Sequence, residues 1–500
     1  MTSPRRHFAG CLLVVLLALA VVPKANAIPA FARKYGLRCS ACHETWPILN
    51  NFGLKFRDNG YQLMNDRDAP IWQNPSYWPV TFRITPIWHR VSANTEVDTY
   101  TGVTAAAPYG ASAVKSVESS GFDLSGLDFH TGGTLEKNIS FYVLPSSDPT
   151  AAFHFETVMA RFDNILGTSW LNLKMGRFEL NNLLSEKRMV GLTAQGGIYQ
   201  TYHYIPVGDA NIFGQMGDNQ LGLEYLGHSY NDRTRVSASL LSSNDGNVNL
   251  IMGSNSYSTF LTFDQGIDTG KLGVQRIGAY YWGGEAATYY RTSAGVAIPG
   301  SGIGNKGFYR VGFTGQLYLG PHFDLNVVTQ HGSDNAWFGQ GYGNAVNTNG
   351  NGATTCTAGI APLTTSGCLP NNTPGTVLPV GSRAAIWNGY TFEARYVFNP
   401  QMIFIAHYDA ERMSQQANGP GYTGLGPTGI AGPSPSSLGN INLWDVLFRY
   451  NPFMSSRAGM AIQPEFTVFQ QTGTGPTNPV TGLGTTEHSS ELLIALDFAF

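Results

Sequence analysis

Two cysteines and a histidine near the N-terminus have the spacing that covalent haem attachment requires. They lie in the run Cys39-Ser40-Ala41-Cys42-His43. In this pattern each thiol adds to one vinyl group of the haem, and the histidine supplies an axial imidazole to the iron. A zinc half-site, a redox-active cysteine pair or a chance match would use the same residue types, but no second Cys/His pair with zinc spacing exists in the chain. The pattern therefore predicts one haem c bound by Cys39, Cys42 and His43.

The second axial ligand of such a haem is marked less clearly. Met64 is the nearest methionine after His43 in the same segment, and methionine opposite histidine raises the reduction potential of a haem. Methionine also fills gaps in apolar cores, so packing is the alternative role of Met64. His407 is the second candidate, with a polar lining role as its alternative. We expect Met64 to be the ligand.

Residues 1–27 have the three parts of a secretory signal peptide. Arg5 and Arg6 give the charged start, Cys11 to Val22 is an apolar run too short to cross a bilayer, and Ala25-Asn26-Ala27 is a small-residue cleavage site. The signal holds three cations and no acids, so its removal changes the formal charge from −3 to −6. This mild negative charge gives no reason to expect nucleic acid as a partner.

Two further cysteines, Cys356 and Cys368, lie in one stretch rich in Gly, Asn, Thr and Pro. Because the export signal implies an oxidising compartment, we expect them to form a disulfide, with two free thiols as the alternative. Closing so short a loop would add roughly 3 kcal/mol of stability. No phosphate loop, nucleophile–base triad or dinucleotide fingerprint stands out, so no catalytic residue is assigned.

The composition favours a membrane-spanning barrel. The chain holds 59 Gly, 24 Tyr, 28 Phe and 9 Trp, and only 13% of its residues are charged. No run of about 20 apolar residues follows the signal, so no transmembrane helix is expected. An exported chain with this composition is typical of the β-barrels of the bacterial outer membrane.

Residues 28–77 are predicted to form a small helical segment around the haem motif, and residues 78–500 the barrel. Trp46 to Met64 has helical spacing. The residues available to one face of this helix are Ile48, Phe52, Phe56 and Leu63. A segment this short buries little surface by itself, so we expect the barrel to complete the haem pocket, with the segment plugging the lumen.

Beyond residue 78 the polarity alternates with a period of two. The clearest case is near Tyr390, where apolar side chains from Tyr390 to Phe398 share one face and Glu393 and Arg395 share the other. Sixteen strands are expected, near residues 80–92, 121–133, 137–146, 151–163, 168–178, 219–228, 232–243, 256–265, 271–285, 306–319, 321–333, 385–398, 401–413, 440–451, 455–471 and 486–500.

The connections between these strands differ in length at the two ends. Those after even-numbered strands are mostly tight turns such as Gly320-Pro321 and Asn399-Pro400, and those after odd-numbered strands are usually long. The connection at Ser146 to Thr150 is a short exception. Short periplasmic turns and long extracellular loops are typical of outer-membrane barrels, so the N-terminus is expected on the periplasmic side. The chain ends on Phe500, which extends the apolar face of the last strand.

The combination of export signal, haem motif and barrel resembles the fused monohaem cytochrome c–porin family, which includes the outer-membrane iron-oxidising cytochromes. Pro29-Ala30-Phe31-Ala32-Arg33 before the haem motif carries the resemblance; Lys34-Tyr35-Gly36 stands where iron-oxidising members often have Gln-Thr-Gly. The resemblance implies electron transfer across the outer membrane. Extracellular Fe(II) would be the donor, and a periplasmic soluble cytochrome c or another electron carrier the acceptor.

Other polar residues are predicted to line the lumen. The inward-facing arginines are expected to be Arg233, Arg235, Arg310, Arg395 and Arg449. Some could pair with haem propionates, but pairing with lumen acids such as Glu393 and Asp445 is the favoured role. Carboxylates near the outer rim could receive iron, because hard oxygen ligands suit the ferrous ion. These carboxylates are Glu96, Asp98, Asp334 and Asp409.

Two alternative functions fit the same sequence. In one, the haem passes electrons outward or accepts them from another donor. In the other, the chain is a diffusion porin with an accessory haem segment outside an open pore. Outer-membrane lipid is an expected partner in every case, and a homotrimer is compatible with a porin-like barrel.

Overall fold

The computed structural model describes residues 30–37, 39–45, 48–65, 68–73, 80–94, 117–147, 153–184, 220–242, 257–288, 304–334, 384–415, 423–425, 431–433, 439–454, 458–477 and 484–500. The predicted signal peptide, the predicted disulfide between Cys356 and Cys368, and the rim carboxylates Glu96 and Asp98 lie outside these residues. Among the residues described, no helix is long and apolar enough to cross a membrane.

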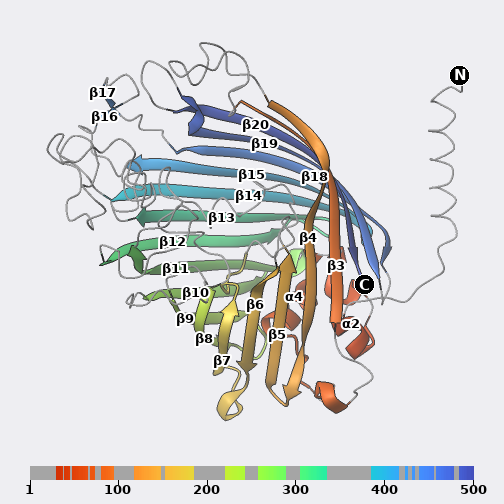
Figure 1. The fold of residues 1–500 in the computed structure, drawn as a ribbon. Coiled ribbons are helices and arrows are strands. Elements are labelled where there is room, and N and C mark those ends of the chain that lie inside the picture. Colours follow the sequence, from red (N-terminus) through yellow and green to blue (C-terminus); the bar gives the residue numbers. More distant parts are fainter. Residues whose placement is uncertain are drawn as a thin grey trace, which may run out of the picture.

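Sixteen antiparallel strands close into one barrel (Figure 1). The expected number and order of strands are confirmed, and the boundaries differ by a few residues. The strands are β3 (Val80–Ala93), β4 (Val117–Glu136), β5 (Ile139–Ser147), β6 (Phe153–Phe162), β7 (Asn172–Phe178), β8 (Gln220–His228), β9 (Thr234–Ser242), β10 (Tyr257–Asp268), β11 (Val274–Thr288), β12 (Gly304–Tyr318), β13 (Phe323–Asp334), β14 (Ala385–Asn399), β15 (Met402–Gln415), β18 (Ile441–Met454), β19 (Gly459–Thr477) and β20 (Gly484–Ala499).

Alternation along each strand separates an apolar exterior from a polar lumen. On β14, Tyr390 and Phe392 are 37% and 41% exposed, whereas Thr391 between them and Glu393 and Arg395 after them are buried. The same alternation holds on β20, where Leu492 and Ile494 face outward and Asp497 is fully buried. Apolar side chains directed at lipid and polar ones at the lumen are the arrangement that a membrane barrel requires.

The seam between the first and last strands closes the barrel. β20 pairs with β3, and the backbone N–H groups of Phe82 and Phe500 each donate to the other residue's carbonyl at 2.9 Å. Their rings stack with centroids 5.6 Å apart. The C-terminal aromatic residue therefore takes part in the joint that removes the last free strand edge.

The connections differ between the two ends of the barrel, as the sequence predicts. At one end, called the tight-turn end below, two residues separate β4 from β5 and β14 from β15. At the other end, residues 335–384 separate β13 from β14. Outside the barrel, β16 (Thr423–Leu425) pairs with β17 (Ala431–Pro433). The tight-turn end is the periplasmic end by the rule that outer-membrane barrels keep their short turns there.

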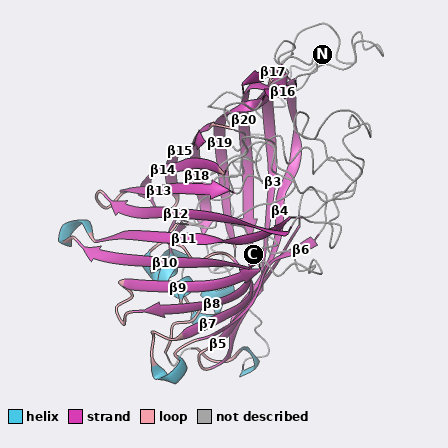
Figure 2. Cartoon of the chain, turned by 90° about the vertical axis from the view of Figure 1, so that its left-hand side faces the viewer, coloured by secondary structure: helices cyan, strands magenta, loops and turns pink. Residues whose placement is uncertain are grey.

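Short elements precede the barrel in residues 30–73, called the plug segment below. They are α2 (Ala30–Tyr35), α3 (Cys39–Cys42), β1 (His43–Thr45), β2 (Ile48–Leu49), α4 (Asn51–Asp58) and the 3-10 helix η1 (Ile71–Gln73). Figure 1 shows these helices near the tight-turn end, and Figure 2 shows cyan helices behind β10 and β11. Two more 3-10 helices lie in turns, at Ile165–Gly167 and Gly270–Leu272.

The helix expected over Trp46 to Met64 is shorter in the structure. It begins after Asn50, whose side chain accepts a hydrogen bond from the Gly53 N–H at 2.9 Å, and it ends at Asp58. Gly60 has a φ of +70° and Tyr61 one of +60°, so the backbone leaves the helical region there. The buried residues are Gly53, Leu54 and Phe56; Phe52 is 40% exposed, and Ile48 belongs to β2.

The plug segment lies inside the tight-turn end of the lumen. Ile48 packs against the inward-facing Ile403, Ile405 and Leu447, on β15 and β18. On the other side, Tyr61 stacks on Tyr142 of β5 with ring centroids 4.7 Å apart. β1 also lies against β14, and Arg161 of β6 donates to the Asp58 carbonyl at 2.5 Å. The strand order places β6 and β14 on opposite sides of the ring. The segment therefore crosses the bore and touches opposite walls.

Candidate functional site

The backbone of the Cys-x-x-Cys-His motif forms one helical turn followed by a strand. α3 spans the two cysteines, and His43 begins β1, where it pairs with Leu49 of β2. One helical turn places residues three apart on the same side. The order of cysteine, cysteine and histidine is therefore compatible with a haem held along one edge of this turn.

Asn50 and Gly53 brace the motif. The Asn50 side-chain N–H₂ donates to the carbonyls of Ser40 and Ala41 at 3.4 and 3.1 Å, and its backbone N–H donates to Cys42 at 2.9 Å. A Cβ on Gly53 would lie 2.1 Å from the Cys42 carbonyl oxygen, so α4 approaches the motif closely. Neither residue was predicted from the sequence, although asparagine just before a helical run is a recognisable capping signal.

The barrel wall holds the strand after His43. The Asn451 side chain on β18 donates to Thr45 Oγ1 at 2.9 Å, and β1 lies against β14. Burial raises the pKa of Glu44 above its usual value, and the nearby Arg395 of β14 offsets part of this effect. The histidine of the motif is thus followed directly by residues fixed against the β14–β18 wall.

Aromatic rings join the plug segment to the β4–β5 side. Phe31 stacks on Tyr61 with centroids 4.7 Å apart, and Phe56 meets Phe31 edge to face at 5.4 Å. Tyr35 donates to Asp68 at 2.7 Å, and Lys34 donates to Thr134 of β4. Burial lowers the pKa of Lys34, although Asp68 partly opposes this. This cluster gives the short segment a core that it shares with the barrel.

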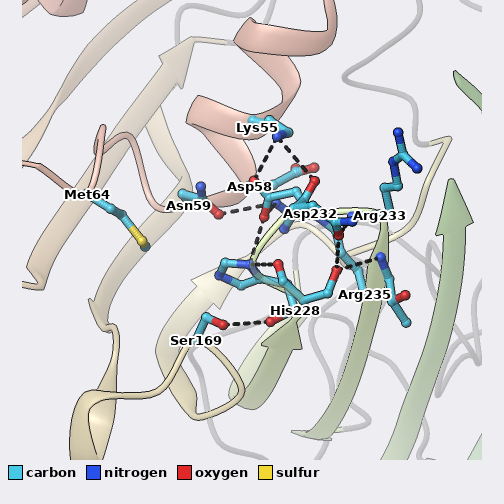
Figure 3. Close-up of polar contacts among 12 residues, drawn as sticks. Lys55, Asp58, Asn59, Met64, Ser169, His228, Asp232, Arg233 and Arg235 are labelled. Atoms are coloured by element: carbon cyan, nitrogen blue, oxygen red, sulfur yellow. Dashed lines mark hydrogen bonds and ion pairs between the residues drawn. The ribbon is translucent and has the colours of Figure 1, made fainter. Parts of the chain in front are cut away.

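Ion pairs fix α4 to the turn between β8 and β9 (Figure 3). Lys55 Nζ lies 3.2 Å from Asp232 Oδ2, and Asp232 Oδ1 is 2.7 Å from His228 and 3.0 Å from Arg235. Arg235 also donates to Asn59 at 3.2 Å. Burial alone would raise the pKa of Asp232, but the His228 hydrogen bond and the two cations outweigh it, so the pKa lies below its usual value.

Met64 and β1, the strand that begins at His43, contact different parts of the barrel wall. Met64 has a φ of +57°, and its thioether accepts a hydrogen bond from Asn164 at 3.5 Å in the turn between β6 and β7. Thr45, by contrast, contacts β18. Ligation of the iron by Met64 therefore stays a prediction.

His407 faces the lumen, as expected. Its Nε2 lies 2.7 Å from Asp409 Oδ2, and its Nδ1 lies 3.4 Å from Glu393 Oε2. Both ring nitrogens thus face carboxylates. This arrangement favours the lining role over the ligand role.

Four of the five singled-out arginines are buried on the lumen side. Arg310 pairs with Asp334 at 3.0 Å, Arg449 with Asp497 at 2.7 Å, and Arg395 with Glu393. Arg235 pairs with Asp232. Pairing with acids was the favoured expectation, and these contacts confirm it for the residues named.

Arg233 and Asp445 depart from their expected roles. Arg233 precedes β9, and its side chain is 42% exposed and pairs with Asp268 at 2.8 Å, so it lies in a turn rather than on an inner face. Asp445 is inward-facing, but it accepts a hydrogen bond from Thr467 at 2.8 Å. The first departure arises because β9 begins at Thr234, two residues later than the expected strand, so Arg233 lies before the strand and not in it.

Neither of the two described carboxylates proposed for iron access is exposed, although Asp334 ends β13 at the long-loop end. Asp334 is 1% exposed and bound to Arg310 and to Trp387 Nε1 at 3.0 Å. Asp409 is fully buried between His407 and Thr391. Within the described ranges, no group of three or more His, Cys, Asp or Glu side chains is arranged to hold a metal ion.

Polar groups beside Glu44 provide a test of whether a haem fits. On the neighbouring wall, two donors, Arg276 Nε and the Tyr318 hydroxyl, are buried and have no hydrogen-bond partner among the described residues. A haem carries two propionates that need such partners. The residues present are therefore compatible with the group that the motif predicts.

Comparison with known proteins gives structural matches only. No family model matches the sequence, and no curated protein does. The outer-membrane channel DcaP of Acinetobacter baumannii matches at 9% identity and a TM-score of 0.48, with 84% of this chain and 97% of that chain covered. An anion-selective porin from Comamonas acidovorans matches at 9% identity and 0.43, with 84% and 99% covered. OprB of Pseudomonas putida matches at 10% and 0.42, with 92% and 99% covered.

The exterior of the barrel decides where the chain lies. Its closed ring of sixteen strands leaves no free edge, and its outward side chains are apolar and exposed. Only lipid can cover such a surface without cost. The chain is a multi-pass outer-membrane β-barrel.

Proposed function

We propose that this chain is an outer-membrane c-type cytochrome that conducts electrons across the membrane. The donor would be extracellular Fe(II), and the acceptor a periplasmic soluble cytochrome c or another electron carrier. The position of the Cys39–His43 motif inside the lumen supports the proposal. A haem c bound there would supply a one-electron redox centre within the bore.

The residues of the chain would position this centre and close the pore around it. Cys39 and Cys42 would attach the haem, His43 would bind its iron, and Met64 is the proposed second axial ligand. Asn50 holds the turn that carries the cysteines. Contacts from the plug segment to opposite walls would hinder the passage of ions, so that electrons could cross while ferric product stays outside.

The decisive experiment mixes the purified, haem-loaded chain with Fe(II) at neutral pH and follows the absorption band of reduced haem. We expect the band to grow, and an oxidised periplasmic cytochrome c added afterwards to become reduced. The Cys42→Ala variant, which removes one thioether, is the control for haem attachment. A haem-loaded chain that Fe(II) leaves oxidised would exclude iron as the donor and favour another donor or the reverse direction.

A diffusion porin with an accessory haem is the second candidate. The inward-facing charges favour it, because a lumen lined by ion pairs such as Arg310–Asp334 is compatible with an aqueous channel. Conductance in planar bilayers separates the two functions. We expect low conductance from the intact chain, whereas steady porin-like conductance would support the diffusion porin.

A homotrimer remains a proposal. OmpT of Vibrio cholerae, at 9% identity and a TM-score of 0.42 with 84% of this chain and 99% of that chain covered, is described in a trimer form. Light scattering of the detergent-solubilised chain measures the number of copies directly.

A further inference from the structure

A row of polar residues crosses four neighbouring strands beside the haem motif. It consists of Arg276 on β11, Tyr318 on β12, Asp324 on β13 and Arg395 on β14. Tyr318 pairs in register with Asp324, and Asp324 pairs with Arg395. Arg276 pairs with Gln316, two residues before Tyr318. The row lies at the tight-turn end, where the plug segment enters the lumen.

The row is close to the residue that follows His43. Glu44 lies within electrostatic range of both Arg395 and Tyr318. Tyr318 in turn lies within range of Arg276 and Asp324. A group bound to His43 would therefore have this row as part of its surroundings.

Arg276 differs from the other buried lumen arginines. Arg310 pairs with Asp334, Arg449 with Asp497, and Arg161 with Asp163 at 2.7 Å. Arg276 is only 7% exposed, and within the described ranges no carboxylate binds it and its Nε has no hydrogen-bond partner. A buried cation without a counter-ion is costly, and a bound anionic group at this position would remove that cost.

The neighbours of Arg276 define which ligand fits. The Tyr318 hydroxyl is a second buried donor that has no hydrogen-bond partner in the part of the chain that the structure describes. Arg395 is already engaged by Glu393 and lies 3.8 Å from Asp324. Glu44 and Asp324 also lie within electrostatic range of Tyr318, and among the described residues neither forms an ion pair with Arg276. The Arg276 side is left with a cation and a hydroxyl donor, which together suit a single carboxylate.

We propose that Arg276 and Tyr318 bind a propionate of the haem that His43 carries. The inference rests on the proposed function, because it needs the haem. It adds the residues that would orient the haem and neutralise one of its two carboxylates. Arg276 was not among the arginines singled out from the sequence, and both residues act as positioning groups rather than iron ligands.

The test measures reduction potentials of the full-length, haem-loaded chain and of three variants. Arg276→Gln removes the cation that neutralises the propionate. The negative charge of the propionate then stabilises the oxidised haem, so we expect a lower reduction potential. The substitution also raises the pKa of the propionate, so the potential should depend more steeply on pH between about 5 and 7. Arg276→Lys should restore the wild-type behaviour in part. Arg310→Gln, the matched control, removes a paired lumen arginine and should leave the potential unchanged.

A second measurement covers the case in which Arg276→Gln does not fold. Tyr318→Phe removes one hydroxyl only, and we expect it to shift the propionate bending band in the resonance Raman spectrum. If Arg276→Gln folds, an unchanged potential or an unchanged pH dependence overturns this inference alone. If it does not fold, an unchanged Raman band in Tyr318→Phe does so. A wild-type chain whose pigment is lost on denaturation has no thioether-bound haem, and that result overturns the proposed function as well.

Discussion

At the scale of single residues, the chemistry of the plug segment depends on a few side chains with specific partners. The Cys39–His43 run is recognisable by spacing alone. The partners of the other polar side chains in the plug segment depend on which part of the barrel wall they contact. Met64 and Asp232 are two examples. The first is a proposed ligand held by Asn164, and the second binds α4 to a turn.

The Met64→Ala variant tests the second axial ligand. We expect the haem to change from low spin to high spin and its potential to fall, because the thioether ligand is lost. Electronic absorption and electron paramagnetic resonance spectra measure the change. Asn164→Ala removes only the hydrogen bond to the thioether and should leave the spin state unchanged. If both variants keep the wild-type spectrum, Met64 serves only in packing.

Asp232 makes the attachment of α4 dependent on pH. Its pKa in the folded chain lies below the unfolded value of about 3.9, so its stabilisation is complete above that value and is lost as the pH falls through the lower folded value. We expect faster proteolysis of the plug segment below about pH 4. Asp232→Asn should show this faster cleavage at neutral pH. Equal cleavage of the variant and the wild type at neutral pH would contradict the prediction.

At the scale of elements, the short helix α4 organises the motif. Its N-cap, Asn50, also binds the carbonyls of α3, and Gly53 permits close contact between the two helices. Two short helices and two short strands become ordered because they share these contacts and the barrel wall.

Gly53→Ala should interfere with haem attachment. The added Cβ would lie 2.1 Å from the Cys42 carbonyl oxygen, so α3 or α4 must move. We expect a clear loss of haem per chain, measured by the absorbance of the denatured protein. Asn50→Ala removes the helix cap, and we expect it to lower the free energy of unfolding by about 1 kcal/mol. Phe52→Ala, on the exposed side of α4, is the control. Full haem loading of Gly53→Ala would show that the contact is not needed.

At the scale of the whole molecule, barrel closure and the plug segment depend on contacts between residues far apart in sequence. The seam joins Phe82 to Phe500, and the plug segment reaches Asn451 and Asp232. Such contacts form only when all sixteen strands have their final register. The position of the plug segment is therefore a property of the closed barrel.

Deleting Phe500 should weaken closure. The deletion removes two backbone hydrogen bonds to Phe82 and one ring stack, so we expect unfolding at a lower urea concentration and a smaller folded fraction in outer membranes. Migration of unheated samples in gel electrophoresis measures the folded fraction. Phe500→Ala keeps the backbone pair and should lose less. Wild-type stability after the deletion would show that the seam does not need this residue.

The sequence by itself determined the number of strands, their inward and outward faces, the asymmetry of the connections and the haem motif. These features are local: alternation, turn residues and a five-residue spacing can each be recognised without knowing the neighbours. Errors of a few residues at strand ends changed single assignments such as Arg233, because a residue just before the strand begins is not held on either face.

Only the tertiary structure decided which side chains meet. It placed the plug segment across the bore, shortened the expected helix and paired Arg310 with Asp334. Among the described residues, it gave Arg276 no ion pair with an acid. Closing the barrel brings together residues hundreds of positions apart, and their register depends on every strand between them. No pattern within a short stretch of sequence contains that information.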